Sequence, residues 1–300
     1  MTTRPRQRYR GIINVVLPVC ALLVLSAGCT SFSFSPFAPN APVKPEPAKE
    51  AKHAAPSKHS LRVSQFVFLS DFELKPELPL FKDLEKMRDQ VHKELELPSA
   101  NTLIYVYLFE DRERYERYMK LRYPDLPRRR AFFVAQPRSV GPGDELLVYT
   151  YWGDRIQQDL RHELTHALLH SVLKDVPLWL DEGLAEYYEQ PTEWKGINYH
   201  HLEMLRKSES QPYLARLEQM KQVQDMDPRE YREAWAWVHW MLRGNPKAKE
   251  VLLAYLQQLR TNPTPGPIGP KLEAAVPDMN DVLIGHLARI DIKPAPTAQK

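Results

Sequence analysis

Two histidines one helical turn apart are the first residues in the chain that could do chemistry together. Residues 159–171 read DLRHELTHALLHS and contain the pattern H-E-x-x-H, with His162 and His166 four residues apart. On an α-helix, residues four apart project from the same face, so both imidazoles can bind one metal ion. Glu163 is offset by about 100° from His162 on such a helix and can hold and deprotonate a metal-bound water. The pentapeptide also arises by chance, as two surface histidines that flank a solvated glutamate.

A second segment supplies carboxylates for the same site. A catalytic zinc ion takes three protein ligands and an open fourth position, and two histidines with one glutamate are a recurring set. Residues 177–189 read PLWLDEGLAEYYE, and the connection before them is short enough to fold a second helix back antiparallel to the first. Glu182 and Glu186 are four apart on this helix, so both can face the histidines.

HELTH followed by WLDEGLAEYYE resembles the gluzincins, the thermolysin-like zinc metallopeptidases. The closest resemblance is to the peptidase-MA-like domains of bacterial secreted proteins and lipoproteins. It is specific over residues 159–189 and loose over the rest of residues 60–292. The resemblance implies a zincin-like fold, a bound Zn²⁺ and the hydrolysis of peptide bonds in a peptide or protein substrate.

The resemblance also implies a role for each matching residue. The tryptophan-x-x-glutamate-glycine block resembles the one that carries the third zinc ligand in related aminopeptidases, so His162, His166 and Glu182 would bind zinc. Glu163 would act as general base. Glu186 occupies the position of a carboxylate that hydrogen-bonds a ligand histidine and fixes its tautomer.

The chain departs from the family pattern at three points. Fifteen residues separate His166 from Glu182, which is shorter than the usual gap, and Glu186, with nineteen between, fits the spacing better by counting alone. Arg161 stands where an uncharged residue is usual, and we expect it on the solvent side of the helix. The glycine-rich strand that reads a substrate N-terminus in aminopeptidases is absent from residues 131–152, so aminopeptidase activity is not implied.

Support for the transition state is expected from Tyr231. Peptide hydrolysis builds up an oxyanion that a tyrosine or histidine outside the metal ligands can stabilise. Residues 231–239, YREAWAWVH, resemble the helix that follows the metal site in peptidase-MA-like domains. This favours Tyr231 as the first candidate and His239 as the second. Tyr231, Trp235 and Val238 also share one helical stripe, which is typical of a core. His170, the pair His200 and His201, and the run Arg128 to Arg130 are expected to be structural or solvated.

Patterning along the chain predicts an α+β fold, with a small mixed β sheet and its helices followed by a mainly helical half. β-branched and aromatic runs predict strands at 65–69, 102–109, 131–135 and 145–152. Apolar residues at helical spacing predict helices at 80–95, 111–121, 155–173, 178–189, 199–208, 213–222, 228–243, 246–260 and 279–290, with a proline-rich break at 261–270.

The N-terminus has the layout of an export signal. Four arginines precede the short apolar stretch at 12–25, which ends in LSAGC and resembles the lipobox of bacterial lipoproteins. We therefore predict a signal peptide at 1–28, lipidation of Cys29, a proline-, alanine- and serine-rich tether at 29–60, a peptidase-like domain at 61–292 and a disordered tail at 293–300. The threonine after the cysteine favours an outer-membrane lipoprotein that faces the periplasm, held to the membrane by its lipid anchor. Only Cys29 remains after cleavage, so no internal disulfide supports the fold.

Charge excludes one class of partner. The whole chain has a formal charge of +3, and removal of the four arginines in residues 1–28 changes this to −1. A mature chain near neutrality gives no electrostatic case for nucleic-acid binding. The remaining alternatives to a peptidase are a catalytically inactive zinc-binding scaffold, a metal-free structural lipoprotein and a hydrolase of non-peptide amides in the cell wall.

Overall fold

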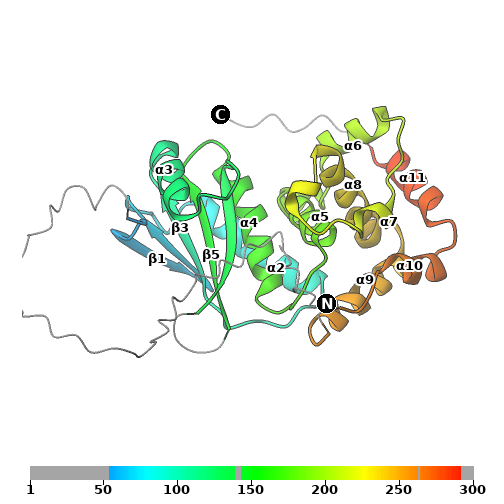
Figure 1. Cartoon of the computed structure of the whole chain (residues 1–300), viewed down its shortest axis with the longest axis horizontal. Helices are drawn as coiled ribbons and strands as arrows, with labels where there is room; N and C mark the ends of the chain where they lie inside the picture. Colours follow the sequence, from blue (N-terminus) through cyan, green and yellow to red (C-terminus); the bar gives the residue numbers. More distant parts are fainter. Residues whose placement is uncertain (1–53, 139–142, 263, 292–300) are drawn as a thin grey trace, which may run out of the picture.

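The computed structural model describes residues 54–138, 143–262 and 264–291. The predicted signal peptide, Cys29, most of the tether and the tail lie outside these residues. Within them the α+β prediction is confirmed: a five-stranded mixed sheet forms one end of the molecule and a group of helices forms the other (Figure 1). None of the helices in the described part is both long and apolar enough to cross a membrane.

The sheet has the strand order β1-β2-β3-β5-β4, with β4 at one edge. The outer pairs β1–β2 and β4–β5 are antiparallel, whereas β2–β3 and β3–β5 are parallel. The strands are β1 (His59–Val63), β2 (Phe66–Ser70), β3 (Ile104–Phe109), β4 (Ala131–Pro137) and β5 (Asp144–Tyr151). Four of them match predicted strands, whereas β1 begins inside the segment that we predicted to be tether.

Alternating side chains give the sheet two buried faces. Ile104 and Val106 on β3 face the main core, together with α2 (Pro79–Glu94) and α4 (Ile156–His170). The opposite face, with Tyr149 and Tyr151 on β5, packs on α3 (Arg112–Arg122) in a smaller aromatic cluster. Because α4 lies between the sheet and the C-terminal helices, it is covered on nearly every side.

The helical half follows α4 directly. Its α-helices are α5 (Leu178–Tyr188), α6 (Tyr199–Lys207), α7 (Leu214–Leu217), α8 (Pro228–His239), α9 (Pro246–Leu259), α10 (Gly269–Ala275) and α11 (Met279–Arg289). The helix predicted at 213–222 is shorter than expected, and that predicted at 228–243 ends at His239 and continues as a π-helical turn, Trp240–Gly244. α10 begins at the end of the predicted proline-rich break at 261–270 and continues into residues for which no helix was predicted.

A buried histidine on α8 pairs with a partly buried histidine on α11. His239 Nδ1 and His286 Nε2 are 3.0 Å apart, so one ring donates a hydrogen bond to the other. Burial, His286 and the charge of Arg243 lower the pKa of His239 to about 3, while burial and Arg289 lower the pKa of His286 to about 4. Both rings are therefore neutral in the folded protein at neutral pH.

This pair makes stability depend on pH. The unfolded chain takes up protons on these histidines below pH about 6.5, whereas the folded chain does not until pH about 4 or lower. Their contribution is therefore complete above the unfolded pKa and falls by about 1.4 kcal/mol per pH unit for each histidine as the pH is lowered toward 4. Urea unfolding at pH 6, 5.5 and 5 should show this slope, and His286→Gln should make it shallower. An unchanged slope in that variant would contradict the assignment.

Candidate metal centre

The two histidines of HELTH lie on the middle of α4 and point to the same place. His162 Nε2 and His166 Nε2 are 3.3 Å apart, which is possible because residues one helical turn apart lie on the same face. Neither ring lies on an open surface, because the helix is enclosed between the sheet, α2 and α5. The reading of HELTH as two solvent-facing histidines is therefore wrong.

Glu182 completes a three-residue cluster from the neighbouring helix. Its Oε2 lies 3.5 Å from His162 Nε2 and 3.6 Å from His166 Nε2. This oxygen is buried and has no hydrogen-bond partner among the described residues. Burial raises the pKa of Glu182, but both histidines outweigh it and lower the pKa to about 2.

The spacing of these three atoms fits zinc. Tetrahedral coordination with bonds of about 2.0–2.2 Å places donor atoms about 3.3–3.6 Å apart. The three observed separations, 3.3, 3.5 and 3.6 Å, fall in this range. The buried carboxylate oxygen and the two imidazole nitrogens together offer three donor atoms that a divalent cation could take.

Glu186 does not take part in this cluster. It lies with His162 and Glu189 in another group whose potential ligand atoms are within 4.8 Å of one another, but that group does not include His166. Its carboxylate is 2.9 Å from His201 Nε2, on α6. Of the two glutamates that the sequence left open as third ligand, only Glu182 approaches both histidines. His201, expected at the surface, is partly buried against this carboxylate.

Two further carboxylates, those of Glu189 and Asp181, lie against the outer nitrogens of the two histidines. Glu189 Oε2 lies 3.1 Å from His162 Nδ1, and Asp181 Oδ1 lies 3.0 Å from His166 Nδ1. The resemblance implied that Glu186 contacts one of these histidines, but in the structure Glu189 and Asp181 take that position. Asp181 lies on α5, immediately before Glu182. Glu189 comes directly after the last residue of the same helix.

Asp181 also contacts a third histidine. Its other oxygen, Oδ2, lies 3.1 Å from His170 Nε2, one turn farther along α4. Burial lowers the pKa of His166, but Asp181 and Glu182 together outweigh it and raise that pKa to about 10. The two histidines in turn hold the pKa of Asp181 below its usual range despite its burial. Asp181 thus ties α5 to two turns of α4, and His170 has the structural role expected for it.

We expect Glu189 to affect metal affinity more strongly than Glu186. Glu189→Gln removes the charged partner of His162, and loss of such a partner typically weakens metal binding about 10- to 100-fold. Glu186→Gln makes the same chemical change one helical turn earlier, but His162 keeps its contact with Glu189 and His166 keeps its contact with Asp181. Competition with a chelator of known zinc affinity would measure both, and equal affinities in the two variants would contradict this assignment.

Arg161 is buried, contrary to the expectation that it faces solvent. Its side chain is 1% exposed and forms an ion pair with Asp83 on α2 at 3.1 Å. It also donates hydrogen bonds to the carbonyl oxygens of Tyr188 and Gln190, at the end of α5. Arg161 therefore fixes α4 to α2 and α5 immediately beside the first ligand histidine.

Glu163 lies beside the ligands but does not join them. Burial raises its pKa, although His162 and His166 act in the opposite direction. Its carboxylate forms no hydrogen bond or ion pair with any residue in the described part of the chain. A carboxylate with a raised pKa and free lone pairs next to a metal site is suited to accept a proton.

Tyr231 approaches the same site from α8. This helix begins at Pro228 because Asp227 caps it, and Glu230 closes a capping box, which places Tyr231 on its first turn. Burial and Glu182 raise the pKa of Tyr231 to about 12, partly opposed by Arg129. Its hydroxyl is close enough to Glu182 to be affected by the charge of that carboxylate.

Arg129 is a further residue near the site that the sequence did not indicate. Its Nη2 donates a hydrogen bond of 3.0 Å to Tyr231 Oη. Although burial lowers its pKa, Tyr231, Glu182 and Glu163 raise it on balance. We expected Arg128 to Arg130 to be a solvated charge run, and the sequence holds no signal that would single out its middle member.

His239 does not lie at the site. It is 3% exposed, and its described neighbours are the rings of Tyr187, Trp235 and His286. None of them is a ligand of the cluster. The expectation that His239 is the second candidate for transition-state support, after Tyr231, is wrong, because His239 lies two helical turns farther along α8, in the core.

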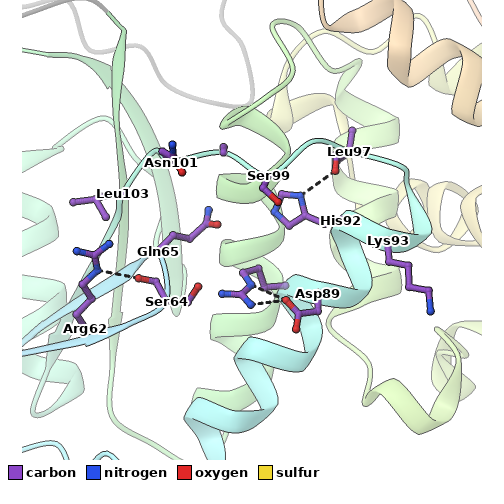
Figure 2. A pocket seen from close by; sticks show the side chains of 12 residues that line it. Arg62, Ser64, Gln65, Asp89, His92, Lys93, Leu97, Ser99, Asn101 and Leu103 are labelled. Atoms are coloured by element: carbon purple, nitrogen blue, oxygen red, sulfur yellow. Dashed lines mark hydrogen bonds and ion pairs between the residues drawn. The ribbon is translucent and has the colours of Figure 1, made fainter.

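A separate cleft lies where the β1–β2 turn meets α2 (Figure 2). It has a volume of about 860 Å³ and is polar, with Arg62, Arg88 and Lys93 among its lining residues. Arg62 and Arg88 are already held, by Ser64 O and by Asp89. None of the cluster residues lines this cleft, and its lining offers no set of three metal ligands.

A family model matches part of the chain. Residues 157–265 match a family model described as a protein of unknown function (DUF1570). This region includes all three potential ligands, Glu163 and Tyr231, but it covers only 109 of the 300 residues. The description names no activity. A search of the curated proteins found no match.

Proposed function

We propose that this protein is a zinc-dependent metallopeptidase of the bacterial cell envelope, with a zincin-like catalytic domain. The observation that carries the proposal is the cluster of His162 Nε2, His166 Nε2 and Glu182 Oε2, with separations that suit one tetrahedral zinc ion. These three residues would hold the metal. Zinc bound there would supply a Lewis acid that lowers the pKa of water to about 7 and polarises a carbonyl group.

Glu163 would act as the general base and then as the general acid during hydrolysis. Its carboxylate accepts a proton from the attacking water, whose oxygen bonds to the carbonyl carbon of the substrate. When the C–N bond breaks, the same carboxyl group returns the proton to the leaving amine, so one water is consumed for each bond cut. Arg129 can only donate hydrogen bonds, so it occupies a lone pair of the Tyr231 oxygen and leaves the hydroxyl hydrogen free. Tyr231 can therefore donate a hydrogen bond to the developing oxyanion.

The sheet supports a peptide as substrate. β4 is an edge strand and packs against α4, which carries the two histidines. An extended peptide can add to such an edge through main-chain hydrogen bonds, and this mode of binding is independent of the peptide's sequence. The bond to be cut would thereby lie along the helix that carries the metal ligands.

Zinc analysis and a hydrolysis assay test the proposal. The purified protein should contain about one zinc per chain after gel filtration, and it should cleave an unstructured protein such as casein. A chelator should stop cleavage and added zinc should restore it. Bound zinc without any hydrolysis would favour the inactive scaffold, and a folded protein that neither holds nor rebinds zinc would contradict the metal site itself.

The envelope location is proposed from the N-terminal sequence alone. Cys29, which lies outside the described residues, would carry the lipid, and the lipoprotein would face the periplasm from the outer membrane. We expect radiolabelled palmitate to be incorporated into the wild-type protein and to be lost in Cys29→Ser. Undiminished labelling in that variant would contradict the anchor.

A further inference from the structure

The position of β4 relative to α4 follows from two contacts. Arg130, just before β4, pairs with Asp159 on the first turns of α4, with Nε and Oδ2 3.0 Å apart. Farther along the strand, the ring of Phe133 stacks on His166 and His170, with centroids 6.2 and 5.6 Å apart. The N-terminal end of β4 therefore lies at the N-terminal end of α4, and the metal ligands lie beside the first residues of the strand.

Arg129 stands just beyond that end of the strand. Arg129 donates one of its five N–H groups to Tyr231, and the residue as a whole is exposed, although its guanidinium is partly desolvated beside the site. Among the described residues it has no carboxylate partner, whereas its neighbour Arg130 has two, Asp154 and Asp159. A planar guanidinium with free N–H groups matches a carboxylate in bidentate geometry.

Chain direction decides which end of a peptide would meet this arginine. A peptide paired antiparallel to β4, the more stable arrangement, runs toward the N-terminal end of the strand. Its residues after the cleaved bond, and then its C-terminus, would arrive at Arg129. A peptide running the other way would bring a positively charged amino terminus to the same guanidinium, and like charges disfavour that orientation.

We propose that Arg129 binds the free C-terminal carboxylate of the substrate, so that the protein cuts short fragments from the C-termini of peptides. This inference rests on the proposed function for the cleavage step, which remains the hydrolysis described above. Arg129 is here a residue that determines specificity. Its contact with Tyr231 would couple the arrival of a carboxylate to the placement of the oxyanion donor.

A library of N-acetylated tetrapeptides, made both as free acids and as C-terminal amides, tests the inference. Retention on the immobilised zinc-loaded protein and cleavage in solution would both be followed by mass spectrometry. Only the free acids can form charge-assisted hydrogen bonds with the Arg129 guanidinium. We therefore expect them to be favoured about 10- to 100-fold over the amides in both measurements. Arg129→Met should bring the ratio close to one, and Arg129→Lys should give an intermediate ratio.

Arg128→Met is the matched control, because Arg128 is an exposed arginine on the same loop with no contact to the cluster. It should keep the preference for free acids, and melting curves should show that all the variants are folded. Selective retention of acids without any cleavage would support the role of Arg129 and contradict the peptidase proposal. Equal retention or equal cleavage of acids and amides, retention of neither form, or a preference that survives Arg129→Met would overturn the inference.

Discussion

Replacing Glu163 by glutamine is expected to abolish most peptide hydrolysis while leaving about one zinc per chain. Glutamine has nearly the same shape but cannot accept a proton, and general acid–base catalysis typically contributes about 10²- to 10⁴-fold to the rate. Zinc should remain because Glu163 is not a member of the cluster formed by His162, His166 and Glu182. Values of kcat/KM and zinc content measured on the same preparation would separate the two effects.

A second glutamate supplies the control for this variant. Glu203 lies on α6, and its exposed carboxylate pairs with Lys207 on the same helix. Glu203→Gln should therefore leave both hydrolysis and zinc content unchanged. Full hydrolysis by Glu163→Gln would exclude Glu163 as the general base, and loss of zinc from it would mean that Glu163 belongs to the metal ligands.

Replacing Gly183 by alanine is expected to lower stability, although alanine is normally the better helix former by about 1 kcal/mol. Gly183 follows Glu182 on α5 and touches α8. A Cβ there would lie 2.7 Å from the carbonyl oxygen of Ala234 and 2.9 Å from Val238 Cγ2, so the two helices would have to separate. Such overpacking costs about 1–3 kcal/mol, and the melting temperature should fall by several degrees.

Gly285 provides the contrasting case on α11. A Cβ at Gly285 would meet only the end of the Arg289 side chain, at 3.4 Å, so Gly285→Ala should be neutral or stabilising. In Gly183→Ala, Glu182 should also move away from the histidines and zinc should bind more weakly. Equal melting temperatures in the two variants would show that α5 and α8 can separate at little cost.

Much of the fold could be predicted because its elements carry clear hydrophobic patterns. β3 and β5 alternate between the two buried faces, and α4 and α5 carry the motif residues together with apolar neighbours. β1 was missed because all of its residues are at least partly exposed, and α10 was missed because its sequence contains a glycine and a proline next to a proline-rich stretch. In both elements tertiary contacts outweigh a weak local pattern.

The three residues of the proposed metal site could be named from the sequence, whereas the residues that support them could not. Spacing within each helix fixes which side chains share a face, so it pairs His162 with His166 and leaves Glu182 and Glu186 both open. The resemblance of the WLDEG block is what singles out Glu182. Which carboxylates meet the outer nitrogens depends on how α4 and α5 cross, and that angle is set by packing across the whole core. For this reason Asp181 and Glu189 take the positions expected of Glu186.

The proposed site consists of a local part and a distant part, and this has a consequence for the order of folding. His166 and Glu182 are 16 residues apart in the chain, whereas Arg129 and Tyr231, which meet beside them, are 102 apart. Closing the shorter loop costs about 1.6 kcal/mol less chain entropy. The α4–α5 hairpin could therefore bind zinc while the chain is still folding. The bound ion would then hold α4 and α5 together while β4 and the later helices pack against them. A misassembled molecule could hold its metal and still be unable to receive a substrate.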